Sequence, residues 1–510
     1  MSPTTTGEDP AVHPAASSVP TAAGHDAADA PGEDTSGSVR ARLATSVRRL
    51  AAVPLVTPAV VFVLMAAYLV AFSLRRYAIG VPAYDAGYFG QAAWLISRGQ
   101  SPVVTVRGLH MLGDHSYLGF YPVALLTRLG EPVVVLFVLQ AIAIAAAVFP
   151  LAAFCRRVAG LGSLGTALVL VAYAFFPAAH NINGADFHPE SLAVPFMVGA
   201  CLAGATRRWV LLTVCVLVTL SLREDLAVSM AVLGLVLFFT VSRRAGAVLA
   251  VGSAVAYVLA TRVLIPHFAG GVYVQEGQLS RFGGSLTGLL KSIATDPLAA
   301  AAQLWDTENG MLLLALLAPV GFLGLAALRW VLPAVPVQVA LLFTDREVAH
   351  TIDAQYVTQA VPFMAVAAAA GLGRLAASGS AVPRAFAPAL VGAAVISWFA
   401  LANDVPASPA NPWVANQERN EAMRAATAAV PSDAAVTATS GAWVQLAERE
   451  VLFPYPEDDA SFFVADEQRI PDEACWAVVA TDDPAYLATP PGRDWEIVFE
   501  QDVYQVLRRC

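Results

Sequence analysis

The first group of side chains suited to acid–base chemistry is a polar motif at residues 84–91. It begins with Tyr84 and Asp85 and ends with Gln91, just before an amphipathic stretch. A carboxylate placed there could accept the proton of a hydroxyl group. Asp is also a favoured residue at the start of a helix. Helix capping does not exclude catalysis, so we keep both interpretations of Asp85.

A second motif places two carboxylates and an imidazole within five residues, at Asp186, His188 and Glu190. Such a group could bind a divalent metal ion, or a phosphate-bearing substrate through that ion. The spacing matches no recognised metal motif, and Pro189 also suits the first turn of a helix that has a polar cap. We therefore leave the metal open and treat the three polar side chains as candidate site residues.

A third motif, Arg223, Glu224 and Asp225, separates two apolar runs. A turn of solvated charges would explain it. Alternatively, Arg223 could clamp a phosphate while a neighbouring acid orients an acceptor. His115 follows another acid and Tyr356 lies in a later polar segment, and each could either bind substrate or serve as an ordinary hydrogen-bonding residue.

The elements that must position these motifs are membrane helices. The chain is 57% hydrophobic and only 14% charged, whereas soluble domains carry about a quarter charged residues. Charge-free runs at 51–74 and 132–155 exceed the roughly 20 residues that a helix needs to cross a bilayer. The net charge of -9 says little about partners, because most acids lie in the two ends. We expect about eleven spans, give or take two: Val53–Leu74, Pro132–Phe154, Leu161–Ala179, Pro189–Thr206, Trp209–Leu222, Leu226–Val241, Ala245–Ile265, Gly310–Leu328, Trp330–Phe343, Val357–Gly373 and Ala385–Ala402.

The distribution of arginine predicts the orientation of these spans, since cytoplasmic loops retain arginine and lysine. Arginines cluster at 40–49, before the first span, which predicts a cytoplasmic N-terminus. Tight arginine pairs between later spans fall on the same side, except Arg75–Arg76. The polar motifs then share the extracytoplasmic side, where ionisable groups near the membrane usually mark a site. The apolar stretch Tyr117–Leu126 is too short to span comfortably, and counting it as a span would reverse everything downstream, so this threading treats it as an interfacial or re-entrant helix.

The two ends of the chain differ from the membrane region, 40–402, in composition. Residues 1–39 have almost no large apolar side chains and are expected to be disordered. Residues 403–510 are expected to form a small extracytoplasmic α/β domain. Its five predicted elements are a helix at Asn416–Val430 and strands at Ala434–Ala438, Cys475–Thr481, Trp495–Phe499 and Val503–Leu507. The five cysteines show no spacing typical of a zinc site or a disulfide framework, and we expect small core residues instead.

Together these motifs resemble the DUF2079 family of predicted membrane proteins. The resemblance rests on residues 84–94 (Tyr-Asp-Ala-Gly-Tyr-Phe-Gly-Gln-Ala-Ala-Trp), 113–115 (Gly-Asp-His), 186–190 and 223–225, and it extends over 53–510. Tyr356 with the later Pro362-Phe363, and a tail pattern from Val430-Pro431 to Phe453-Pro454, fit the same family. One departure is Gln355, where the family pattern has a histidine. His350 could substitute for that histidine.

The resemblance implies a GT-C-like fold, shared with glycosyltransferases that take sugars from polyprenyl-phosphate carriers. It implies transfer to a cell-envelope acceptor at the outer face, with membrane lipid and a polyprenyl-phosphate-linked sugar as partners and no nucleic acid. The alternatives are a transporter, which usually keeps its charges near mid-membrane, and a non-catalytic membrane assembly protein. A divalent metal ion stays open as cofactor. The expected catalytic residues are Asp85, Asp186 and Glu190, and the expected substrate-binding residues are Tyr84, Gln91, His115, His188, Arg223, Glu224, Asp225 and Tyr356.

Overall fold

The computed structural model describes most of the chain after residue 54, and Leu50–Cys510 forms one compact unit. The predicted disordered tail, 1–39, lies outside the described residues. The boundary near residue 402 stays a prediction. The described residues are 55–80, 84–275, 286–304, 307–344, 346–378, 382–405, 417–456 and 470–510.

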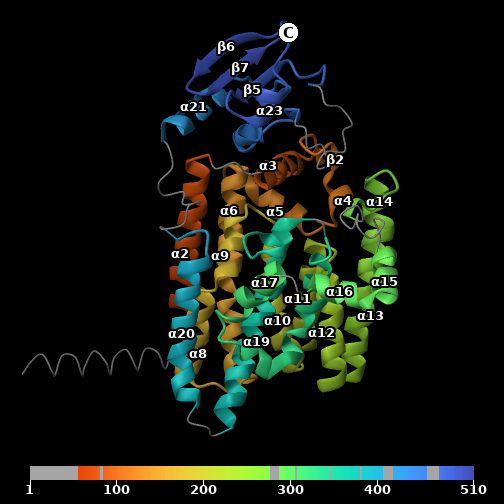
Figure 1. Cartoon of the computed structure of the whole chain (residues 1–510), viewed down its shortest axis with the longest axis vertical. Helices are drawn as coiled ribbons and strands as arrows, with labels where there is room; N and C mark the ends of the chain where they lie inside the picture. Colours follow the sequence, from red (N-terminus) through yellow and green to blue (C-terminus); the bar gives the residue numbers. More distant parts are fainter. Residues whose placement is uncertain are drawn as a thin grey trace, which may run out of the picture. The chain divides into compact units, whose positions relative to one another are not determined.

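Helices dominate the region before residue 405 (Figure 1). Short 3-10 segments join several of them: η1 (Thr127–Leu129), η2 (Pro189–Ala193), η5 (Leu323–Trp330), η6 (Leu332–Ala334), η7 (Glu347–His350) and η8 (Gln355–Val357), while η3 (Ala260–Leu264) is a π-helical turn. The long and intermediate helices are α2 (Val56–Ala78), α6 (Pro132–Ala146), α7 (Val148–Arg157), α8 (Ser163–Ala174), α9 (Pro177–Gly184), α10 (Val194–Ala205), α11 (Trp209–Leu222), α12 (Leu226–Thr240), α13 (Arg243–Leu259), α14 (Ile265–Phe268), α15 (Leu286–Thr295), α16 (Pro297–Leu304), α17 (Thr307–Leu317), α18 (Val335–Leu341), α19 (Ala360–Ala377) and α20 (Val382–Leu401).

Five helical stretches in the described residues are long and apolar enough to cross a membrane, or six if the bent pair η5 and 332–341 counts as one span. The five are Val56–Ala78, Pro132–Arg157, Ser163–Gly184, Arg243–Phe268 and Ala360–Ala377. The predicted eleven spans are therefore not confirmed. Several of them fall on shorter helices such as α11, whose 14 residues extend about 21 Å, less than the ~30 Å hydrocarbon core. The protein is nevertheless a multi-pass membrane protein.

Helices α11 and α12 show how the fold separates the arginine pairs from the polar motifs. Arg207 and Arg208 precede α11, whereas Arg223 follows its last residue. α12 then returns to Thr240, where Arg207 Nη2 donates to the carbonyl oxygen of Val241 over 3.2 Å. The paired arginines therefore lie at one end of this helix pair, and the charged turn 223–225 lies at the other.

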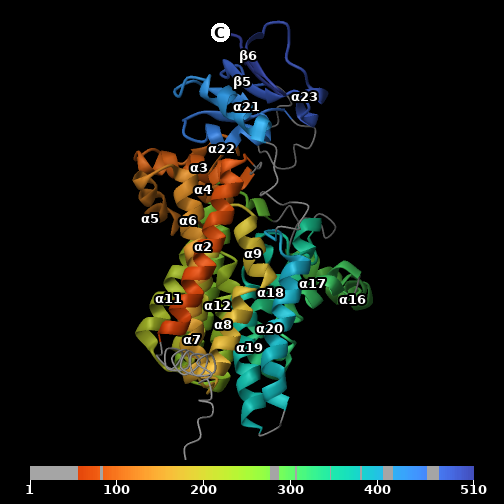
Figure 2. The same ribbon diagram turned by 90° about the vertical axis from the view of Figure 1, so that its left-hand side faces the viewer.

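The segment after α2 forms a cap of short elements over this polar end (Figure 2). It contains α3 (Tyr84–Ser97), a hairpin of β1 (Val103–Val104) and β2 (Leu109–His110), α4 (Met111–Asp114) and α5 (Phe120–Leu126). α5 is only seven residues long, so the apolar stretch 117–126 is too short to be a membrane span, as predicted. α3 is buried along nearly its whole length.

The C-terminal region forms a five-stranded sheet in the order β4-β3-β5-β7-β6. β3 pairs in parallel with β4 and β5, and β7 pairs antiparallel with β5 and β6. The predicted helix and strands are all present, while β4 was not predicted. The elements are α21 (Gln417–Ala428), β3 (Val436–Ala438), η10 (Ser440–Ala442), α22 (Trp443–Leu446), β4 (Leu452–Pro454), β5 (Trp476–Ala480), α23 (Pro484–Ala488), β6 (Glu496–Gln501) and β7 (Tyr504–Arg508).

A disulfide joins Cys475 to Cys510, with 5.3 Å between the two Cα atoms. The expectation that the cysteines form no disulfide was therefore wrong. The two residues are 35 positions apart, and only the antiparallel pairing of β5 with β7 places Trp476 beside Arg508 and brings the flanking cysteines together. The remaining three cysteines are free and buried, as expected.

The sheet region packs on α3 through α22 and the following segment (Figure 2). The Trp443 ring contacts the Tyr84 ring edge-on at 5.3 Å between centroids. A Cβ atom at Gly87 would lie 3.0 Å from that of Trp443. Thr105 Oγ1 both accepts from the Leu452 amide and donates to the Leu452 carbonyl, each over 2.8 Å. The contacts of Tyr84 and Gly87 with Trp443 fix α3, which carries the first polar motif. The Thr105 hydrogen bonds fix the segment that follows α3.

Candidate functional site

A cavity of about 630 Å³ lies at the polar end of the helices. Its walls come from α3, the segment 107–117, the turn at 223–225, α12, α13 with η3, α18 and η8. Gln91, Asp186 and Glu190 are described residues that do not line this cavity. The predicted site residues that do line it are Tyr84, Asp85, His115, His188, Arg223, Glu224, Asp225 and Tyr356.

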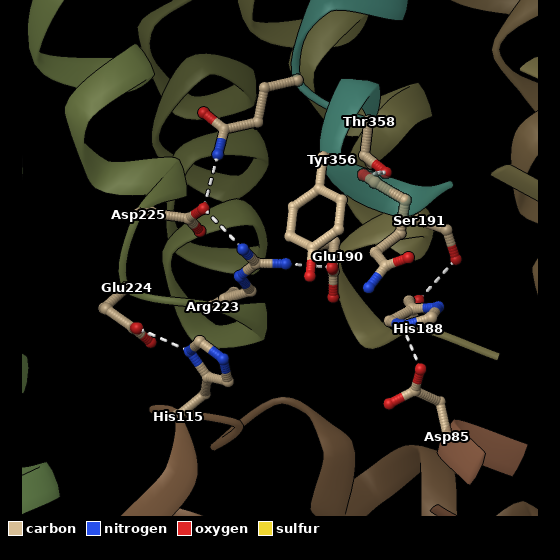
Figure 3. A network of polar contacts seen from close by, with 12 residues as sticks. Asp85, His115, His188, Glu190, Ser191, Arg223, Glu224, Asp225, Tyr356 and Thr358 are labelled. Atoms are coloured by element: carbon tan, nitrogen blue, oxygen red, sulfur yellow. Dashed lines mark hydrogen bonds and ion pairs between the residues drawn. The ribbon is translucent and has the colours of Figure 1, made fainter. Parts of the chain in front are cut away.

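Asp85 and His188 form the pair most suited to proton transfer (Figure 3). Asp85 Oδ2 lies 3.3 Å from His188 Nε2. The Asp85 side chain is 37% exposed, whereas that of His188 is 4% exposed. Burial opposes protonation of His188, but the nearby Asp85 carboxylate outweighs it, and the net effect raises the pKa of the imidazole. Asp85 therefore faces the cavity with an imidazole behind it.

Arg223 is fixed between two carboxylates (Figure 3). Its Nη1 pairs with Glu190, and its Nη2 lies 2.9 Å from Asp225 Oδ2. The Gln359 amide donates to the same Asp225 oxygen over 2.8 Å and accepts from Ser229 Oγ over 2.6 Å. Arg223 Nε has no hydrogen-bond partner in the described part of the chain. Glu190 thus acts on the cavity through Arg223.

Glu224 and His115 form a second acid–imidazole pair at the cavity wall. His115 Nδ1 lies 2.6 Å from Glu224 Oε1, and the Ser116 amide donates to Glu224 Oε2 over 3.0 Å. Tyr273 donates to Glu224 over 3.2 Å. Burial alone would raise the pKa of Glu224, but His115, Arg223 and the Ser116 amide lower it to about 2. The pKa of His115 is raised, because attraction to Glu224 exceeds the burial effect.

The other two predicted residues contact different parts of the fold. Gln91 is fully buried, and its amide donates to Thr105 Oγ1 over 2.8 Å and to the Arg449 carbonyl over 3.2 Å. Gln91 therefore joins α3 to the C-terminal region. Asp186 pairs with Arg76 at 2.9 Å and lines a separate small void. Neither side chain faces the cavity.

Three further arginines line the cavity and were not predicted as site residues: Arg107, Arg262 and Arg346. Arg107 lies 3.5 Å from Asp114, and Arg346 Nη1 donates to the Tyr356 hydroxyl over 2.7 Å. Arg262 had a usable signal, because it is a charge inside a predicted span. It lies in the π-helical turn η3, a type of irregularity frequent at functional sites.

Gln355, at the position where the family resemblance leads one to expect histidine, lines the cavity beside Tyr356. His350 does not line it, so this imidazole does not replace the expected one. In the ranges that the structure describes, no group of three or more His, Cys, Asp or Glu side chains is arranged to hold a metal ion.

Apolar side chains from three helices form a further part of the cavity wall. α12 contributes Val228, α13 contributes Val258, and α18 contributes Val337 with neighbouring residues. Val258 is 54% exposed, so this wall continues onto the apolar outer surface of α13. The cavity thus combines arginines and carboxylates with an adjoining apolar surface.

The fold is similar to that of ArnT from Cupriavidus metallidurans. The apo form matches with a TM-score of 0.52 and 14% identity, over 89% of this chain and 98% of ArnT. A second structure of ArnT, bound to undecaprenyl phosphate, matches with a TM-score of 0.49, 12% identity and the same coverage. No curated protein matches the sequence. Residues 75–491 match the family described as "Predicted membrane protein (DUF2079)", and the chain belongs to this family.

Proposed function

We propose that this protein is a membrane glycosyltransferase that transfers a sugar from a polyprenyl-phosphate donor to a cell-envelope acceptor. The observation that carries the proposal is the composition of the cavity. An accessible carboxylate, Asp85, faces the same space as Arg107, Arg223, Arg262 and Arg346, and an apolar wall adjoins them. A lipid-linked phosphate ester needs all three features: a base for the acceptor, cations for the phosphate and an apolar surface for the chain.

In the proposed reaction, Asp85 accepts the proton of an acceptor hydroxyl as its oxygen attacks the anomeric carbon of the sugar. The bond between that carbon and the phosphate oxygen breaks, and its electron pair leaves with the polyprenyl phosphate. Attack from the side opposite the leaving group inverts the configuration. His188 Nε2 lies 3.3 Å from Asp85 Oδ2 and stabilises the negative charge of the carboxylate before the proton is transferred.

We assign binding of the leaving phosphate to Arg223, whose guanidinium two ion pairs hold in place. Glu190 and Asp225 hold its guanidinium on two sides, and its Nε is left without a partner in the described residues. Charge-assisted hydrogen bonds from a preorganised arginine stabilise the developing negative charge without reorganisation during the reaction. We assign Glu190 to orienting Arg223, and Glu224 with His115 to shaping the wall beside it. No step of this scheme requires a metal ion.

We propose that the cavity opens on the extracytoplasmic side, with the N-terminus in the cytoplasm. The arginine pairs flanking α11 and α12 lie at the end opposite the charged turn 223–225, as the positive-inside rule requires. The disulfide between Cys475 and Cys510 supports the same orientation independently, because such bonds persist in oxidising compartments. The sheet region would then face the cell envelope.

The proposal is tested with purified protein in lipid nanodiscs. The probes are polyprenyl-phosphate-linked pentoses and hexoses, and mass spectrometry measures the polyprenyl phosphate released in the presence of envelope glycan. Wild-type protein should release it, and Asp85→Asn should lower the rate by about 10²–10⁴-fold, the usual contribution of a general base. Asp353→Asn is the matched control, because this exposed carboxylate lies outside the cavity.

Equal release by wild type and Asp85→Asn would remove the carboxylate from the proposed chemistry and overturn the role of Asp85. Two outcomes without any release would overturn the enzyme assignment itself. Absence of release with every probe, together with altered solute uptake by cells that carry Asp85→Asn and unchanged envelope glycans, would favour a transporter. Unchanged glycans and unchanged uptake would favour a non-catalytic assembly protein.

A further inference from the structure

The turn that carries His188 has an unusual backbone conformation. Asp186 has a φ angle of 68°, in the left-handed region that residues with a Cβ atom rarely adopt. Asp and Asn tolerate this region better than other side chains. Backbone strain of this kind persists only where the surrounding structure enforces it, so the contacts that hold the turn are informative.

The first of these contacts is an ion pair behind the turn. Asp186 Oδ1 accepts from Arg76 Nη2, at the end of α2, over 2.9 Å. The two side chains are only 10% and 13% exposed. They line a void of about 10 Å³ with Gln445 of α22, separate from the large cavity. The Asp186 carboxylate therefore contacts the fold behind the turn instead of the space where Asp85 lies.

The second contact is the fully buried amide of Gln140 in α6. Its Nε2 donates to the carbonyl oxygen of Asp186. Its Oε1 accepts from the His188 amide over 2.8 Å and from Ser191 Oγ over 2.8 Å. One side chain thus connects both ends of the turn, and its donor and acceptor atoms each have a separate task.

Packing completes the arrangement on the cavity side. Phe187 is fully buried and contacts the Phe89 ring edge-on at 5.4 Å between centroids. The same Phe89 ring meets the His188 ring at 6.1 Å. Phe89 lies on α3, the helix that carries Asp85. Packing on Phe89 therefore fixes the turn relative to α3, and His188 Nε2 points toward Asp85 (Figure 3).

We propose that Asp186 and Gln140 are positioning residues: together with Arg76 they hold the strained turn that aims His188 at Asp85. This inference rests on the proposed function and deepens it, since it assigns Asp186, a residue that the sequence predicts to be catalytic, the task of holding the turn. A catalytic role of the Asp186 carboxylate and a positioning role make opposite predictions for substitutions that keep the backbone conformation.

The decisive substitution is Asp186→Asn. Asparagine tolerates the left-handed conformation, and its amide oxygen still accepts from Arg76. The rate of polyprenyl phosphate release should therefore stay close to that of wild type. Asp186→Ala loses the acceptor and should lower kcat by about 10²-fold with an unchanged KM, because the imidazole is misplaced but the substrate still binds. Asp186→Gly restores the backbone freedom but not the Arg76 contact, and should lie between the two.

Two substitutions in α6 provide the matched comparison. Gln140→Leu removes both the donor and the acceptor of this side chain. Gln140→Glu keeps an acceptor for the His188 amide but loses the donor to the Asp186 carbonyl, because a carboxylate oxygen takes the place of the amide nitrogen. Both should lower kcat and flatten the limb of the pH–rate profile that reports the Asp85–His188 pair. A purely structural contribution of Gln140 would change the amount of folded protein and leave that profile unchanged.

A readout independent of catalysis separates failure of this inference from failure of the proposed function. Modification of His188 by diethyl pyrocarbonate, followed by mass spectrometry, should be slow in wild type and Asp186→Asn and faster in Asp186→Ala and Gln140→Leu. That pattern without polyprenyl phosphate release would support the positioning role and reject the glycosyltransferase. Protected His188 with no turnover in Asp186→Asn, in a preparation whose wild type is active, would make the Asp186 carboxylate catalytic and overturn the inference.

Discussion

Replacing Arg223 by methionine tests whether this arginine neutralises the carboxylates of Glu190 and Asp225. The Arg223 side chain is 13% exposed and that of its partner Glu190 is 2% exposed. Breaking a buried ion pair by removing one partner costs about 3–5 kcal/mol, because the other charge stays buried without compensation. Asp225 loses its cation in the same variant, so we expect the upper part of that range for Arg223→Met.

Glu190→Gln should cost less. The amide oxygen that this substitution introduces could still accept from Arg223, and Asp225 would still neutralise the guanidinium at 2.9 Å. The loss then resembles that of one hydrogen bond to a charged group, about 1.5–3 kcal/mol. The double variant Arg223→Met with Glu190→Gln removes both charges of the pair. It should be more stable than Arg223→Met alone, because position 190 no longer carries a buried carboxylate without a cation.

Equilibrium unfolding in mixed micelles, at increasing fractions of denaturing detergent, gives the free energies of the four proteins. The double-mutant cycle then yields a coupling energy, expected to be about 2 kcal/mol or more. A cost of Arg223→Met no greater than that of Glu190→Gln would refute the reasoning, as would strictly additive effects. Either result would mean that water or another cation compensates Glu190.

Three further predictions concern other contacts. Glu224 raises the pKa of His115. The excess thermal stability of wild type over His115→Gln should therefore be largest below the usual imidazole pKa of about 6.5, and it should be lost as the pH rises through the raised pKa of the folded protein. An equal excess at about pH 5.5 and about pH 9 would contradict the ion pair. Cys475→Ser should lower stability by about 3–4 kcal/mol, since the bond to Cys510 closes a loop of 35 residues, and thiol labelling with and without reductant checks that the wild-type pair is oxidised. Trp443→Ala, at a side chain only 2% exposed, should cost about 3–5 kcal/mol and expose the C-terminal region to limited proteolysis, whereas unchanged protease resistance would show that this contact is dispensable.

Much of the architecture was predictable because apolar length and periodicity are local properties. The helix α21 and the strands β3, β5, β6 and β7 lie where their patterns indicate. The number of spans was not predictable, because the positions of helix breaks depend on tertiary geometry and not on composition. The segment 323–341, for example, is apolar except for Arg329 and Gln338 but bends by 72° between its two helical parts. The disulfide was missed for a related reason, since the pairing of β5 with β7 determines which cysteines meet.

The candidate site could be predicted as a set of motifs but not as a set of roles. Motifs at 84–85, 115, 188, 223–225 and 356 do meet around one cavity. Gln91, Asp186 and Glu190 occur in the same motifs, yet each side chain points to a partner from a distant segment. Neighbours in sequence thus have different tasks in the fold, and spacing alone cannot separate them.

The sequence by itself determined that the chain enters the membrane, that its polar groups gather at one end of the helices and that its last hundred residues form a separate pattern. These properties follow from the free energy of burying each residue, which depends on composition along the chain. Only the tertiary structure decided which charges face the cavity and which face each other. A side chain's direction depends on the local backbone, such as the positive φ of Asp186, and on partners more than a hundred residues away, such as Arg76.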